Sequence, residues 1–78
     1  MVTVEEWERI DALTCGEATN LFNEIRAEIE ASADDNMKSM LQGYDNCVEP
    51  RSDFNDCQKT VRRKMIIKYW LAAKPVAV

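Results

Sequence analysis

The chain has 78 residues and a net charge of −4, with 46% hydrophobic and 31% charged residues. These values predict one small globular domain over residues 1–78 and exclude wholesale disorder. The sequence contains no histidine, so it lacks the commonest general base and the commonest metal ligand. We therefore expect a protein that is not an enzyme and that binds no cofactor and no metal ion.

The charges are divided unevenly along the chain. All 14 Asp and Glu residues lie before residue 57, together with four of the ten Lys and Arg residues, and the other six basic residues follow. Such a division either pairs within the fold or presents two different surfaces to partners. The pattern is one of binding rather than of chemistry.

Two helices are predicted in the first part of the chain. Thr3 with Glu6 and Thr14 with Glu17 have the spacing of capping boxes, which begin helices. Apolar residues then recur at helical spacing. They are Val4, Trp7 and Ile10 in the first helix and Ala18, Leu21, Phe22, Ile25 and Ile29 in the second.

Two further helices follow. Ser32 with Asp35 is a third start signal, Pro50 ends that segment, and Ser52 is the expected cap of the last helix. The chain has only two glycines and two prolines, and its apolar residues do not alternate as in a strand, so an all-helical fold is expected. We predict an all-α bundle of three to four helices with a long C-terminal helix, at about residues 4–13, 15–31, 33–48 and 53–73.

The last predicted helix is apolar nearly all round between Met65 and Leu71, where only Lys68 is polar. A helix of this kind has to be covered on more than one face. The side expected to be buried in the bundle carries Phe54, Val61, Met65 and Ala72.

The opposite side of this helix allows two interpretations. In the first, the helix is the centre of the bundle, and acidic residues of the earlier helices lie near its basic side chains. In the second, its apolar residues are exposed among arginines, which is the composition of an interface hot spot. The candidate partner-binding residues are Lys59, Arg62, Arg63, Ile66, Ile67 and Trp70.

The three cysteines do not form an obvious disulfide framework. Cys47 and Cys57 flank the Pro50 loop, so a bridge between them stays open, and Cys15 is expected to be a small buried hydrophobe. The first ten residues lack the features of a signal peptide, and no apolar stretch approaches the roughly 20 residues of a membrane span. We therefore expect a cytoplasmic protein with reduced cysteines.

By elimination, the predicted function is binding. The first hypothesis is a small regulator or inhibitor that covers a surface of a larger protein, of the kind that phages and mobile elements encode. One alternative is a nucleic-acid-binding protein that uses the basic C-terminal helix, although the net charge of −4 opposes it. The other alternative is a structural subunit of a homo-oligomer.

Overall fold

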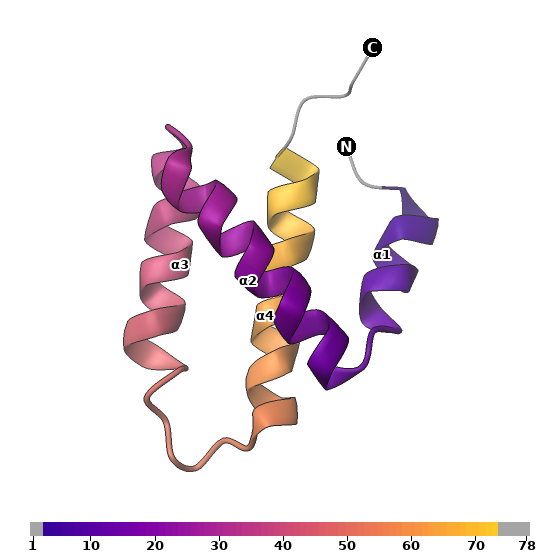
Figure 1. Ribbon diagram of the computed structural model, residues 1–78, viewed down its shortest axis with the longest axis vertical. Coiled ribbons are helices and arrows are strands. Elements are labelled where there is room, and N and C mark those ends of the chain that lie inside the picture. The colour runs from indigo at the N-terminus through magenta and orange to yellow at the C-terminus, as the bar shows by residue number, and fades with distance from the viewer. Residues whose placement is uncertain (1–2, 74–78) are drawn as a thin grey trace.

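The computed structural model describes residues 3–73, and the part of the chain that it describes is all-α. This confirms the predicted bundle with a long last helix. In Figure 1, α2 crosses in front of α4, with α3 on one side and α1 on the other. The helices are α1 (Val4–Asp11), α2 (Cys15–Ala31), α3 (Asp35–Cys47) and α4 (Asp56–Ala73).

The first two helix starts are those that the sequence predicts. The Thr3 hydroxyl accepts a hydrogen bond from the Glu6 backbone N–H at 3.1 Å. At α2 the capping box is complete, because Thr14 Oγ1 accepts from Glu17 N at 3.1 Å and Glu17 Oε1 accepts from Thr14 N at 3.0 Å. These bonds hold the pKa of the Glu17 carboxyl below its ordinary value. α1 ends at Asp11, two residues earlier than predicted.

The start of α3 differs from the prediction. Ser32 does not cap α3 but ends α2, since its hydroxyl donates to the Ile29 carbonyl at 2.8 Å. The cap is Asp34, whose carboxylate accepts from the Met37 backbone N–H at 3.1 Å. Aspartate and serine are about equally good at this position, so the sequence pattern alone could not choose between neighbouring candidates.

α4 also begins later than predicted, at Asp56 rather than at residue 53. Asn55 and Gln58 exchange side chain to backbone hydrogen bonds, each of 2.8 Å, in the manner of a capping box. Ser52, the expected cap, lies instead in the loop that joins α3 to α4. This loop therefore covers residues 48–55 and is longer than the sequence suggested.

The core lies around α4, which contacts each of the other three helices. This confirms the interpretation in which the last helix is the centre of the bundle. Half-buried Leu13, Leu21, Met40, Val48, Trp70 and Leu71 surround the core. The buried cluster consists of Ile10, Phe22, Ile25, Ile29, Met37, Leu41, Tyr44, Ile66 and Ile67.

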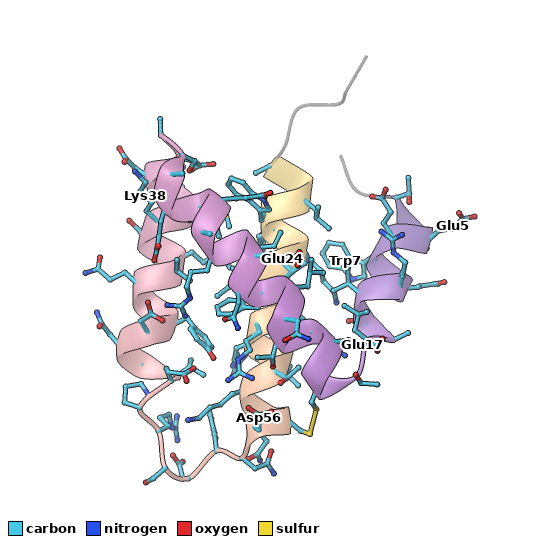
Figure 2. The ribbon with its side chains drawn as sticks, in the orientation of Figure 1. Glu5, Trp7, Glu17, Glu24, Lys38 and Asp56 are labelled. Carbon is cyan, nitrogen blue, oxygen red and sulfur yellow. A yellow bond between two sulfur atoms is a disulfide. The ribbon has the colours of Figure 1, made fainter. Side chains whose placement is uncertain are left out.

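A disulfide joins the start of α2 to the start of α4. It links Cys15 to Cys57, which are 42 residues apart in the chain (Figure 2). Two expectations are therefore wrong: Cys15 is not a small buried hydrophobe with a free thiol, and the cysteines are not all reduced. The Cys47–Cys57 bridge that the sequence left open is not formed, because Cys57 is bridged to Cys15 and Cys47 is free and exposed. No described helix is long and apolar enough to cross a bilayer.

The disulfide closes a long loop, so its loss should strongly destabilise the fold. Cys15→Ser and Cys57→Ser should each lower the free energy of unfolding by about 4 kcal/mol, because the unfolded chain regains the freedom of that loop. Urea unfolding followed by circular dichroism measures this loss. Cys47→Ser is the matched control and should leave the free energy of unfolding unchanged; equal stability of all three variants would show that the bridge contributes nothing.

Candidate functional site

The structure corrects the assignment of faces on α4. Ile66 and Ile67 are 3% and 0% exposed, and Arg63 is 6% exposed, on the side of the helix that the sequence left open between the centre of the bundle and an interface. Val61 and Met65, expected to be buried, are 60% and 40% exposed. The helix is therefore rotated by about half a turn relative to the prediction.

The other predicted partner-binding residues are divided between core and surface. Trp70 is half-buried against the core, and its indole N–H donates to Glu28 of α2 at 3.2 Å. Lys59 is half-buried and donates to the Glu49 carbonyl at 2.5 Å, whereas Arg62 is exposed. The partner-binding role of the six residues stays a prediction, but their apolar members face the bundle interior.

A buried guanidinium explains why this side of α4 turns inward. Arg63 Nε donates to Tyr44 Oη of α3 at 2.7 Å, and its Nη1 donates to Thr19 Oγ1 of α2 at 3.0 Å. The same Nη1 contacts Asp56 at 2.9 Å and Thr60 at 3.2 Å within α4. A buried charge is tolerated only when it is paired and hydrogen-bonded, and these contacts come from three helices. Arg63 therefore fixes the rotation of α4.

Tyr44 and Glu49 extend this network toward the surface. The Tyr44 hydroxyl donates to the Glu49 carboxylate, which lies 3.6 Å from Arg63 Nη2. Burial, followed by the bond to Glu49, raises the pKa of the Tyr44 phenol to about 12. The bond from Tyr44 holds the pKa of the Glu49 carboxyl below its ordinary value. The phenol is thus neutral and acts as a donor.

Two lysines of α4 hold α1 in place. Lys64 Nζ donates to the carbonyls of Asp11 and Leu13, at 2.8 and 2.7 Å, where α1 ends. Lys68 forms an ion pair with the Asp11 carboxylate, and its ammonium lies 4.7 Å from the centroid of the Trp7 ring. A cation near a helix C-terminus and over an indole face is favourable on both counts. These two basic side chains of α4 therefore position α1 and its tryptophan.

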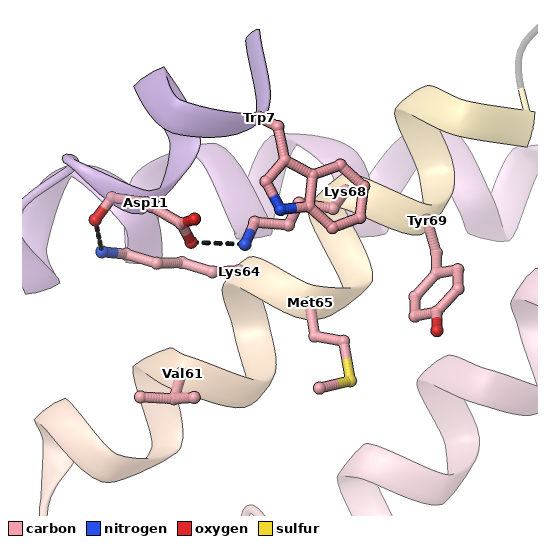
Figure 3. Close-up of a pocket in the computed structure, with 7 residues that line it drawn as sticks. All are labelled: Trp7, Asp11, Val61, Lys64, Met65, Lys68 and Tyr69. Carbon is pink, nitrogen blue, oxygen red and sulfur yellow. Dashed lines mark hydrogen bonds and ion pairs between the residues drawn. The ribbon is translucent and has the colours of Figure 1, made fainter. Parts of the chain in front are cut away.

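A groove lies between α1 and α4, beside these contacts. It has a volume of about 360 Å³, and Figure 3 shows Trp7, Met65 and Tyr69 around it. Trp7 and Tyr69 are 42% and 51% exposed. Within residues 3–73, five large hydrophobic residues are exposed; four of them line this groove, and the fifth is Val4 of α1. The lining residues are Trp7, Asp11, Val61, Lys64, Met65, Lys68 and Tyr69.

A second hollow, of about 150 Å³, lies on the other side of α4, against α3. Met65 lines both hollows, so they are two parts of one surface. On α4 this surface is formed by Val61, Met65 and Tyr69, which are four residues apart and therefore lie on one side of the helix. This side points away from α2, because Arg63, Ile67 and Trp70 occupy the opposite side. We call this surface the open face; its apolar residues are Trp7, Met40, Val48, Val61, Met65 and Tyr69.

Sequence reasoning missed the open face for a definite reason. Trp7 was assigned to an inner apolar stripe, and Val61 and Met65 were assigned to the core, since each fits an amphipathic pattern. The signal that could have found the correct rotation is Arg63 three residues after Thr60, because a short hydroxyl one turn away is a partner for a buried guanidinium. Its more distant partners, Thr19 and Tyr44, could not be recognised from sequence.

The corrected rotation of α4 can be tested by a pair of truncations. Ile67→Ala should lower the free energy of unfolding by about 2–5 kcal/mol, since it leaves a cavity in the core. Val61→Ala should change it by no more than about 0.5 kcal/mol, because that side chain is largely in solvent. Urea denaturation measures both, and a larger effect at residue 61 than at residue 67 would restore the sequence-based assignment.

The raised pKa of Tyr44 predicts a loss of stability at alkaline pH. Above pH 10 the unfolded chain releases the phenol proton while the folded chain keeps it, so the unfolded state binds fewer protons. The free energy of unfolding contributed by this group should fall as the pH rises from 10 to about 12. Tyr44→Phe should remove this part of the pH dependence in urea titrations and Tyr69→Phe should not; identical profiles for the two variants would contradict the network.

The arrangement offers binding surfaces rather than ligand cages. Among residues 3–73, no group of three or more His, Cys, Asp or Glu side chains is placed to hold a metal ion. The cationic groups that line the groove, Lys64 and Lys68, are already bonded to α1.

Comparisons with protein-family models, with curated proteins and with solved structures gave no match to this chain.

Proposed function

We propose that this protein is a small non-enzymatic regulator or inhibitor that binds a larger protein through its open face. The observation that carries the proposal is the concentration of exposed apolar side chains. Trp7, Val61, Met65 and Tyr69 line one groove instead of being scattered over the surface. Contiguous apolar patches that include aromatic residues are typical of protein interfaces, and tryptophan and tyrosine are enriched among hot spots.

The groove is also held in shape before any partner arrives. Lys68 and Asp11 fix the Trp7 wall, and Lys64 fixes the end of α1 that carries it. A surface that is ordered in advance loses less conformational entropy on association. This supports binding by a preformed surface on rigid helices.

The contacts of the basic side chains weaken the support for nucleic-acid binding. Lys59, Arg63, Lys64 and Lys68 are all bonded within the chain. Arg62 is left as the one described cation of α4 for which no internal hydrogen bond or ion pair is recorded. Phosphate binding needs several free cations on one surface, so we keep protein binding as the proposal.

Cytoplasmic localisation and a phage or mobile-element origin stay predictions. The Cys15–Cys57 disulfide argues against the cytoplasm and for an oxidising compartment, because such bonds persist mainly outside the reducing cytosol.

Site-specific photo-crosslinking in the source cells tests the proposed function. A benzophenone amino acid replacing Tyr69 should form a covalent adduct with a partner protein, because it lies on the wall of the groove. The same amino acid replacing Ala27, an exposed residue of α2 that lines neither hollow of the open face, should form none.

A second variant links the adduct to the groove itself. Met65→Asp introduced together with the crosslinker at residue 69 should abolish the adduct while leaving the circular dichroism spectrum unchanged, because Met65 is exposed in the folded chain. Equal adduct yields at residues 69 and 27, or an adduct that survives Met65→Asp, would refute the proposal.

A further inference from the structure

We infer that the occupant of the open face is an amphipathic helix of another protein, with lysine or arginine residues along the flank that meets α1. This inference rests on the proposed function and specifies the partner. It follows from the shape of the open face and from the charges at its two margins.

The shape favours a helix over an extended segment. Among residues 3–73 there is no strand, so the described surface has no sheet edge to which an extended peptide could add. Val61, Met65 and Tyr69 form a row of about 12 Å along α4, since each residue rises 1.5 Å along a helix. That length matches the anchors i, i+4 and i+7 of a docked helix.

The bundle itself leaves space for this helix. α1 and α3 contact α4 on its two sides, and α2 packs on its buried side. The shortest extent of the molecule is 16 Å, which accommodates two layers of helices at interaxial distances of 8–10 Å. A helix laid on the open face would cover the remaining exposed side of α4. Met65 lies between Trp7 and Tyr69, and its flexible side chain can adjust to the docked helix.

The net charge of the protein and the charged residues at the margins of the open face indicate the charge expected on the partner helix. The chain carries a net charge of −4, and the lysines beside the groove are bonded to α1 rather than directed to a ligand. At the α1 margin, Glu8 lies three residues before Asp11, on the same side of α1, and is exposed. At the α3 margin, Arg62 lines the second hollow. Basic residues therefore fit the α1 side of a docked helix, and attraction between net charges speeds its approach.

Binding of defined peptides tests this inference. The probe is a fluorescently labelled amphipathic peptide of leucine and lysine, about five helical turns long. Its counterparts are a leucine–glutamate peptide with the same apolar stripe and a leucine–lysine peptide whose stripe is scrambled. Anisotropy titration of the purified, oxidised protein should show binding of the first peptide at least about tenfold tighter than of either counterpart.

Charge-matched variants separate docking in the groove from simple attraction to an acidic protein. Met65→Asp and Ala27→Asp add the same charge at exposed helical positions. Met65→Asp should weaken binding of the leucine–lysine peptide about tenfold or more, whereas Ala27→Asp should leave it equal or slightly tighter. Equal effects of the two variants would overturn the inference.

The two margins give a reciprocal test of the orientation of charge. Glu8→Gln should weaken binding about twofold, and Arg62→Gln should tighten it by a similar factor, since exposed charges contribute little each. Glu24→Gln, the same change at an exposed position of α2, is the control and should have no effect. Weakening by Glu24→Gln as large as by Glu8→Gln would overturn the assignment of the basic flank to the α1 side.

The remaining outcomes distinguish this inference from the proposed function. Binding of neither peptide, with a crosslink still formed at residue 69, would overturn the helical partner and leave protein binding intact. Absence of both would remove the two proposals together. Concentration-dependent dimerisation that Met65→Asp abolishes, measured by analytical ultracentrifugation, would identify a second copy of this chain as the occupant and would overturn the inference.

Discussion

The position of one guanidinium determines how this small fold is assembled. Arg63 is almost fully buried and bonded to side chains of α2, α3 and α4. A charge that is almost fully buried is tolerated only when it is paired and hydrogen-bonded, as this guanidinium is. The observed rotation of α4 satisfies all these contacts and places Ile66 and Ile67 in the core. It also turns Val61, Met65 and Tyr69 to solvent, so the open face is a consequence of the buried charge.

The division of charge along the sequence has a structural use in this arrangement. The basic side chains of α4 are matched to groups on the earlier parts of the chain: Arg63 to Glu49 and to its own helix start, Lys68 to Asp11, and Lys64 to the end of α1. The contacts of Lys64 and Lys68 attach α1, which has Ile10 as its single buried residue. The charge pattern therefore describes intramolecular assembly, and the surface left over is acidic with an apolar groove.

Local signals in the sequence predicted the four helices and the caps of α1 and α2, but chose the wrong caps for α3 and α4. The larger failures are those of long-range information. Thr3 and Thr14 mark helix starts through bonds to residues three positions away, so the pattern contains both partners. The rotation of α4 depends on Thr19 and Tyr44, which are 44 and 19 residues from Arg63. Because the segment from Met65 to Leu71 is apolar on nearly all sides, its periodicity does not select a buried face. The central place of α4 was predictable, but the exposed row and the Cys15–Cys57 pairing were not.

The covalent connection divides the molecule into parts of unequal permanence. The segment from residue 15 to residue 57 is a closed ring that contains α2, α3 and the long loop, and α4 continues from its end. α1 lies outside the ring and is retained by Ile10, two lysines and the turn at residues 12–14. α1 is thus the helix whose attachment to the bundle depends on the fewest buried side chains. The position of the wall that carries Trp7 therefore depends on Ile10 and on the two lysine contacts, whereas α2 and α3 are enclosed by the covalent ring.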